Sequence, residues 1–220
     1  MAQGKPKFTA ILMGHSFLSG LHDHLMFRYK LKSNGKLSFP SFCSHELKVD
    51  SIINDLHIVG HSGAKVTVDF QLPTKELTNF QPQIAILDIG SNDIMSHAPL
   101  PDIEYQIIST AEALVNLYNV QQVKVCSVLR RQPPANSLIT YDQFCTRAYN
   151  LNGQLSHSLA GNPRISYHIH EGFWTDANSN TTTPTQWSFD GIHPNHPEGR
   201  AKYKKSLTAA IRNAARDVPR

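Results

Sequence analysis

The stretch Phe8–Leu21, FTAILMGHSFLSGL, joins an apolar run to a glycine and a serine, and it decides the fold predicted for the rest of the chain. Its first six residues, Phe8–Met13, have the length and apolar character of a buried strand. The run breaks at Gly14, and apolar residues with helical spacing follow it. Ser16 therefore stands on a sharp turn between a strand and a helix, with the helix N-terminus beside its hydroxyl. A serine in this position is typical of a catalytic nucleophile.

Strand-like and helix-like segments alternate along the whole chain. Further apolar runs predict strands at residues 56–59, 84–89, 123–129 and 165–169. Helical spacing predicts helices at residues 16–31, 74–80, 102–118, 141–159 and 196–215. Asp102 is the expected N-cap of the helix that it opens. This alternation predicts a three-layer α/β/α fold around a parallel sheet of about five strands.

Three segments are predicted to contain no helix. Residues 32–51 are rich in Ser, Lys, Pro and Phe and predict a loop with little regular structure. Residues 66–70 alternate apolar and polar side chains, which predicts a further extended piece. Residues 172–189 predict a polar loop, and either of the two long loops could supply a lid over a site.

Composition places the chain among ordinary globular proteins. With 220 residues, of which 40% are hydrophobic and 17% charged, we expect one domain spanning residues 1–220. No apolar run approaches the roughly 20 residues of a membrane span. The N-terminal apolar run is too short for a secretion signal, so we expect an intracellular, cytoplasmic protein. Cys43, Cys126 and Cys145 form no close pair in the sequence, and we expect free thiols.

Polar, glycine-bearing segments leave three of the predicted strands, at residues 14–16, 60–63 and 90–93. Because the carboxyl ends of parallel strands meet at one edge of a sheet, these segments should converge. A fourth segment, Asp190–Asn195, immediately precedes the last helix. Its Asp190 and His193 can face the same side of a turn, so that the carboxylate accepts from one ring nitrogen while the other points at a serine.

Taken in order, these segments resemble the four sequence blocks of the SGNH hydrolase superfamily, also called GDSL esterases and lipases. The matching residues are Gly14-x-Ser16, Gly63, Gly90-x-Asn92-Asp93 and Asp190-x-x-His193. The resemblance covers the chain end to end. It implies a flavodoxin-like parallel sheet and a serine esterase that forms an acyl-enzyme intermediate.

The resemblance also implies a role for each site residue. Ser16 would be the nucleophile, His193 the general base and then acid, and Asp190 the residue that orients His193. The oxyanion hole would combine the Ser16 N–H, the Gly63 N–H and the Asn92 side-chain amide. A glycine lets an oxyanion approach the backbone, and an asparagine amide is a neutral donor, so both residue types suit this role. We expect a small-molecule ester of a short acyl or acetyl group as substrate, and neither cofactor nor metal.

One departure from the family pattern is His15, which stands where the family usually has aspartate. The imidazole can pin the nucleophile turn by hydrogen bonding, or it can mark lost activity. A hydrogen-bonded histidine beside the turn is the interpretation we favour. The alternative function is a catalytically silent binding module of the same fold. Domains of this superfamily also occur in retrotransposon-encoded proteins, which leaves open that the chain belongs to a mobile element.

Ser62 is a rival nucleophile, because Gly60–Ala64 resembles the Gly-x-Ser-x-Gly elbow of the α/β-hydrolase fold with Ala64 for the last glycine. That elbow needs a long helix after it. Here the alternating, β-branched segment Lys65–Val68 follows, which disfavours a helix and the elbow with it.

Histidines and basic residues suggest further sites that we consider less favoured. The histidine pairs lack the cysteine or carboxylate that would complete a metal site, and they are His22/His24, His168/His170 and His193/His196. Arg130 and Arg131 are expected to be loop charges, with binding of an anionic substrate group as the alternative. The last helix carries a basic group that predicts a solvated face more readily than a nucleic-acid surface, made by Arg200, Lys202, Lys204 and Lys205.

Overall fold

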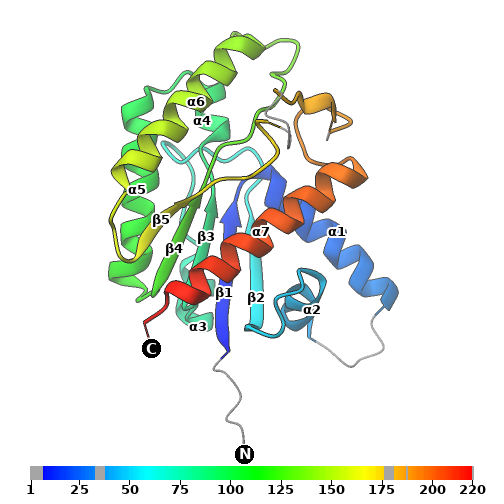
Figure 1. The fold of residues 1–220 in the computed structure, drawn as a ribbon, viewed down its shortest axis with the longest axis vertical. Coiled ribbons are helices and arrows are strands. Elements are labelled where there is room, and N and C mark those ends of the chain that lie inside the picture. Colours follow the sequence, from blue (N-terminus) through cyan, green and yellow to red (C-terminus); the bar gives the residue numbers. More distant parts are fainter. Residues whose placement is uncertain (1–6, 33–37, 176–180, 187, 220) are drawn as a thin grey trace, which may run out of the picture.

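A computed structural model of the chain describes residues 7–32, 38–175, 181–186 and 188–219. It contains a five-stranded sheet in the order β2-β1-β3-β4-β5, and every neighbouring pair of strands is parallel (Figure 1). The strands are β1 Phe8–Gly14, β2 Ile53–Gly60, β3 Ile84–Asp88, β4 Gln122–Cys126 and β5 Ile165–His168. The predicted parallel sheet of about five strands is therefore confirmed, and its strand order is the flavodoxin-like one.

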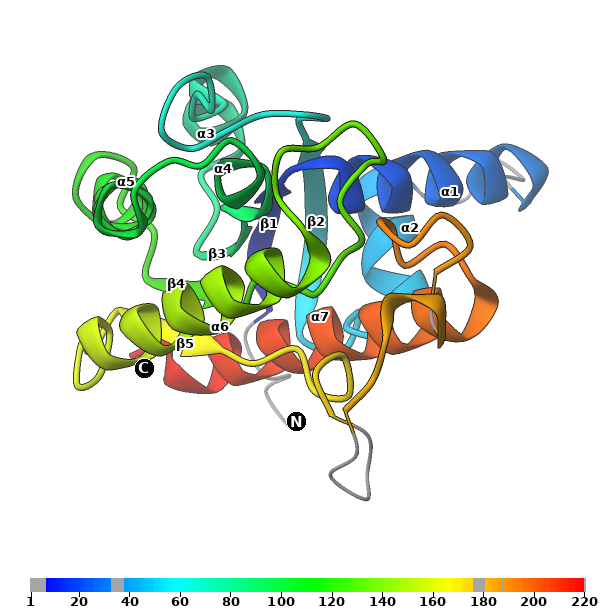
Figure 2. The ribbon, with the colours of Figure 1, turned by 90° about the horizontal axis from the view of Figure 1, so that it is seen from above.

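Helices cover both faces of the sheet, which gives three layers (Figure 2). The helices are α1 Ser16–Lys32, α2 Phe39–Glu46, α3 Thr74–Phe80, α4 Ser91–Met95, α5 Leu100–Leu117, α6 Tyr141–Ser158 and α7 Pro197–Asp217. A hydrophobic core lies on each face of the sheet, and successive residues of β1 point into opposite cores. Ala10 and Leu12 pack with α1, α2 and α7, whereas Ile11 and Met13 pack with α3 to α6. Because β1 and β3 are covered on both faces, they read in the sequence as unbroken apolar runs.

The strand order places a topological switch point at β1, since the chain turns from β2 on one side of β1 to β3 on the other. At the carboxyl edge Gly14 pairs with both Gly60 and Asp88. The segments that carry Ser16, Gly63 and Asn92 therefore leave three adjacent strands at the same edge of the sheet.

Four details differ from the sequence-based predictions. Residues 32–51 contain helix α2, whose N-cap Ser38 accepts a hydrogen bond from the Ser41 N–H; residues 33–37 lie outside the described part. Residues 66–70 form turns rather than an extended piece. Helix α5 begins at Leu100, so that Asp102 lies in its first turn and is not the N-cap. The short helix α4 and the 3-10 turn Pro184–Gln186 were not predicted.

Other predictions agree more closely. Thr140 and Gln143 form a reciprocal capping box at the start of α6, where the sequence predicted a helix start. The three cysteines are free thiols, as expected. Within the described ranges, no helix is both long and apolar enough to cross a bilayer.

Candidate active site

The serine turn joins β1 directly to α1. The His15 carbonyl accepts hydrogen bonds from Leu18 N at 3.1 Å and Ser19 N at 3.2 Å, which starts the helix at Ser16. The His15 N–H in turn donates to the Asp88 carbonyl at 3.3 Å, and this ties the turn to the end of β3. Ser16 is half-buried, and its N–H has no acceptor among the described residues. The turn thus presents both a hydroxyl and an unpaired donor.

Two glycines allow the strand ends to approach this turn. A Cβ at Gly14 would lie 2.3 Å from the Asp88 carbonyl oxygen, and a Cβ at Gly60 would lie 2.3 Å from Ser19 N. Real Cβ atoms do not approach backbone that closely, so neither position accepts a larger residue without movement of the chain. Gly14 was predicted as the break after the strand; the close approach at Gly60 was not predicted.

Asp190 and His193 meet on one turn. His193 Nδ1 lies 2.8 Å from Asp190 Oδ2, and the other carboxylate oxygen accepts the backbone N–H groups of Ile192 and His193 at 2.8 and 2.7 Å. Ser188 Oγ and Asn195 Nδ2 donate to the same carboxylate. Burial alone would raise the pKa of Asp190, but these hydrogen bonds, above all those from His193, hold it well below its usual range.

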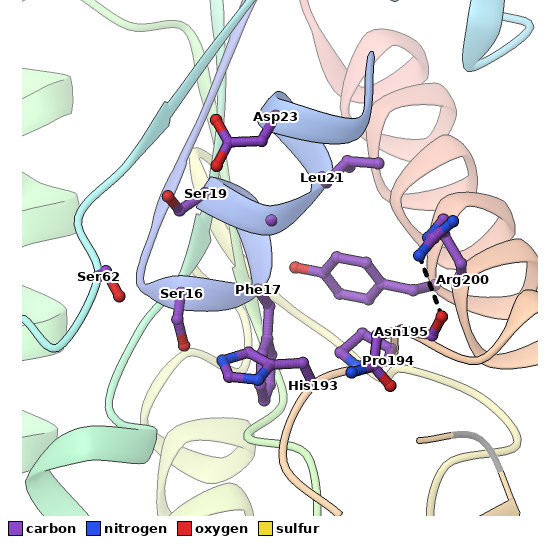
Figure 3. A pocket seen from close by; sticks show the side chains of 12 residues that line it. Ser16, Phe17, Ser19, Leu21, Asp23, Ser62, His193, Pro194, Asn195 and Arg200 are labelled. Atoms are coloured by element: carbon purple, nitrogen blue, oxygen red, sulfur yellow. Dashed lines mark hydrogen bonds between the residues drawn. The ribbon is translucent and has the colours of Figure 1, made fainter. Parts of the chain in front are cut away.

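The carboxylate beside Nδ1 fixes the proton of a neutral His193 ring on that nitrogen and leaves the lone pair on Nε2. Ser16 and His193 line one pocket of about 320 Å³, between the start of α1 and the segment before α7. Figure 3 shows the Ser16 hydroxyl pointing toward the His193 ring. The two side chains are not hydrogen-bonded to each other. Phe17, which also lines the pocket, packs edge-on against His193, with 5.7 Å between ring centroids.

Ser62 also lines this pocket. Figure 3 shows it on the far side of Ser16 from the His193 ring. The residues after it form turns rather than the long helix of a nucleophile elbow. The structure thus brings the Asp190–His193 pair to Ser16 and not to Ser62.

Gly63 lies on the exposed loop after β2, with φ of +79° and open space where a Cβ would be. Its N–H has no acceptor in the described part of the chain. Asp93 holds this loop against α4, because its carboxylate accepts Val66 N and Thr67 N at 2.9 Å each and Thr67 Oγ1 at 2.7 Å. This function of Asp93 could not be predicted from the sequence, since the three contacts lie 26 or 27 residues away along the chain.

Asn92 is held from both ends of its side-chain amide. Its Nδ2 donates to the Ala64 carbonyl at 2.9 Å, and its Oδ1 accepts from Arg131 Nη1 at 3.0 Å. One of the two Nδ2 hydrogens remains without an acceptor among the described residues. Neither Asn92 nor Gly63 contributes to the described lining of the 320 Å³ pocket. Both lie at the same sheet edge, Asn92 in helix α4 after β3 and Gly63 on the loop after β2.

Arg131 is not the loop charge that was expected. Its side chain is buried, 7% exposed, and burial lowers the pKa of the guanidinium to about 10. No carboxylate lies within 4 Å of it in the described part of the chain, and its Nε has no hydrogen-bond partner. Arg130 is half-buried, stacks on Trp174 and donates to the Thr182 carbonyl at 2.8 Å.

Behind the serine turn lies a buried polar cluster around Asp88. Tyr203 donates a hydrogen bond to Asp88 Oδ2, and the Nε2 atoms of His15 and His170 lie 3.8 and 3.7 Å from its carboxylate. Burial would raise the pKa of Asp88, yet His170, His15 and Tyr203 outweigh it and the net direction is down. His168 and His170 both contact Ser206 Oγ. Nothing in the sequence pattern identified Asp88 or Tyr203.

His15 is buried beside the turn, but its side chain makes no hydrogen bond to any residue that the structure describes, so the expectation of a hydrogen-bonded ring was wrong. Its Nδ1 is buried without a partner. Removal of the ring from water lowers its pKa from 6.5 to about 4, against the pull of Asp88. The ring therefore stays neutral near pH 7 and packs edge-on against Phe17, with 4.6 Å between centroids. Its backbone, rather than its imidazole, holds the nucleophile turn.

The sequence matches no protein-family model and no curated protein sequence. Its structure is similar to that of a candidate acylhydrolase from Bacteroides fragilis, with a TM-score of 0.67 at 17% identity over 96% of this chain and 89% of that one. A GDSL-like lipase from Bacteroides thetaiotaomicron gives a TM-score of 0.66 at 19% identity over 97% and 93% of the two chains. An acetyl esterase variant with bound acetate gives 0.55 at 16% identity over 96% and 100%. The chain thus has the fold of these hydrolases.

Proposed function

We propose that the chain is a serine esterase of the SGNH hydrolase type, which cleaves carboxylic esters through an acyl-enzyme intermediate. The observation that carries this proposal is the hydrogen bond between His193 and Asp190 on a turn that shares a pocket with Ser16. The fold shared with GDSL-like lipases and an acetyl esterase supports it.

In the proposed mechanism Ser16 Oγ attacks the ester carbonyl while His193 Nε2 takes the hydroxyl proton. Asp190 stabilises the imidazolium and keeps the ring oriented. The negative charge that develops on the carbonyl oxygen is met by the N–H groups of Ser16 and Gly63 and by the Asn92 amide. His193 then returns the proton to the departing alcohol. A water molecule, deprotonated by His193, finally releases the acid from Ser16.

We propose short acyl groups, acetyl among them, as the preferred substrates. A pocket of about 320 Å³ is at the small end of the range for ligand sites. Its lining includes Phe17, Leu21 and Tyr203, which are nearly inaccessible to solvent and are therefore held in place by the core. A rigid pocket of this size favours a small acyl group over a long chain.

Hydrolysis of p-nitrophenyl acetate, butyrate and octanoate by the wild type tests the proposal. We expect the highest kcat/KM with acetate. Ser16→Ala and His193→Ala should each reduce turnover to near background, and the double variant should be no worse, because nucleophile and base act as a unit. Ser62→Ala is the matched control in the same pocket and should retain most activity. Loss of activity in Ser62→Ala, with activity kept in Ser16→Ala, would instead favour the nucleophile elbow at Ser62. If the folded wild type hydrolyses none of these esters, the chain is better explained as a silent binding module.

A further inference from the structure

A second cavity of about 590 Å³ lies between α1, the end of α2 and α7, on the side of the sheet where Figure 2 shows these three helices together. It is larger than the pocket beside Ser16, and its described lining is dominated by cationic side chains. The six residues that are positively charged at neutral pH are Arg28, Lys48, Arg200, Lys204, Lys205 and Arg212. Glu46 is the single carboxylate in that lining.

We call this second cavity, with its six cationic residues, the basic groove. The carboxylate in its described lining compensates only part of its positive charge. Glu46 Oε2 lies 3.0 Å from Arg28 Nη1 and 3.5 Å from Lys204 Nζ, so that one carboxylate is shared by two cations. Arg212 donates to the Lys48 carbonyl at 2.8 Å, a partner without net charge. Lys48 and Lys205 have no side-chain hydrogen bond or ion pair within the described residues. The groove therefore concentrates like charges that an external anion would neutralise.

His24 lines the basic groove, and its pKa reflects the positive charges around it. Its Nδ1 lies 3.3 Å from Arg200 Nη1. Burial, together with the charges of Arg200, Arg28 and Lys204, lowers the pKa of the imidazole. A histidine that is discouraged from taking a proton is consistent with a positive potential inside the groove.

We propose that the basic groove binds a compact polyanion, a ligand that carries several phosphate or sulfate groups. Six cations against one carboxylate exceed what a single phosphate can balance. The forked guanidinium groups and lysine ammonium groups are the side chains that bind such oxyanions best. The described lining contains no Phe, Tyr or Trp on which bases could stack, so a single-stranded nucleic acid is disfavoured. A soluble polyphosphorylated molecule and a phosphorylated lipid headgroup share the required chemistry.

Isothermal titration calorimetry with inositol hexakisphosphate at 0.15 M salt tests this proposal. The proposal does not depend on the proposed esterase activity, so the Ser16→Ala variant should bind inositol hexakisphosphate equally well. We expect a single site, with affinity that falls as salt rises. Lys205→Glu and Arg212→Glu, both at exposed positions, should each weaken binding by about tenfold. The matched control is Lys75→Glu on α3, which makes the same charge change on the other face of the sheet and should leave affinity within about twofold.

Vesicles with and without phosphatidylinositol bisphosphate distinguish the two sources of the ligand. Binding to the phosphorylated vesicles that inositol hexakisphosphate displaces and Arg212→Glu weakens would assign the groove to a lipid headgroup. Binding of the soluble ligand alone would assign it to a free polyanion. Three results would overturn the proposal: no binding of either probe, an equal loss in Lys75→Glu, or tighter binding of a nucleic-acid duplex that the groove variants abolish.

Discussion

Arg131 donates a hydrogen bond of 3.0 Å to the side-chain oxygen of Asn92, and it does so from a buried position without a carboxylate partner within 4 Å in the described part of the chain. Such a contact orients the Asn92 amide and draws electron density from it, which strengthens its N–H groups as donors. The positively charged Arg131 thus acts on the proposed oxyanion hole through Asn92.

We expect Arg131→Met to lower kcat for p-nitrophenyl acetate by about tenfold with KM nearly unchanged, because the orientation of the Asn92 amide matters mainly when charge develops in the transition state. Arg131→Lys keeps one donor and should restore part of the rate. Equal losses in the two variants, or a loss confined to KM, would show that Arg131 does not act through the Asn92 amide.

Replacing Asn92 with alanine should lower kcat by about 10²–10³, or roughly 2.7–4 kcal/mol, with little change in KM, as for removal of one oxyanion donor elsewhere. The ester carbonyl oxygen becomes a strong acceptor only when Ser16 adds to it. Because Asn92 also donates to the Ala64 carbonyl, melting of the same variant is the control. A large fall in Tm with kcat preserved in the folded fraction would make Asn92 purely structural.

The Asp190 carboxyl should stabilise the fold in a pH-dependent way. Its pKa is lowered in the folded state, so its contribution is fully present above the unfolded value of about 3.9 and is lost as pH falls below it. Urea unfolding of wild type and Asp190→Asn at pH 5 and pH 3 measures this effect. The wild type should be the more stable at pH 5, and the difference should shrink at pH 3; a difference independent of pH would contradict the assignment.

His15 should produce pH dependence in a higher range. Its folded pKa of about 4 lies below the unfolded value, so the folded state resists protonation and loses stability as pH falls from about 6.5 toward 4. Between pH 7 and pH 5 this one group should cost about 2 kcal/mol of unfolding free energy. Urea unfolding of His15→Asn should show a correspondingly flatter profile than the wild type. Burial also lowers the pKa values of His168, His24 and His57, so these residues leave some slope in the variant. A profile of unchanged slope would mean that His15 titrates normally.

Metal chemistry forms no part of the proposed mechanism. Incubation with EDTA should therefore change neither the esterase rate nor Tm. A stoichiometric metal that EDTA removes together with activity would contradict this expectation, and addition of the same metal would identify it.

The parts of the fold that the sequence predicted well depend on local or periodic signals. Strands β1 and β3 are buried on both faces, and their unbroken apolar runs identify them. The contact between Asp190 and His193 is also local, since it spans one turn. By contrast α2 has only three buried side chains, so its apolar periodicity was too weak to reveal it even though Ser38 and Pro40 are typical of a helix start.

Polar contacts across the fold could not be predicted in this way. Tyr203 reaches Asp88 from 115 residues away, and Arg131 reaches Asn92 from 39 residues away. A single sequence records which residues are polar, but the partner of each depends on how the elements pack. The buried state of Arg131 and the unsatisfied ring of His15 follow from the same packing, and no periodicity marks either.

Among the described residues, every hydrogen bond to the Asp190 carboxylate comes from residues 188–195, so one local segment holds both the carboxylate and the His193 imidazole. Within the described residues, two hydrogen bonds join this segment to the rest of the molecule. The Gln132 N–H donates to the Gly191 carbonyl at 2.6 Å, and the Arg200 guanidinium donates to the Asn195 carbonyl at 3.0 Å. The distance from His193 to Ser16 therefore depends on how this segment packs against the rest of the molecule, and not on the geometry within the segment. Loss of either hydrogen bond would shift Asp190 and His193 together, leaving an intact acid–base pair out of reach of Ser16.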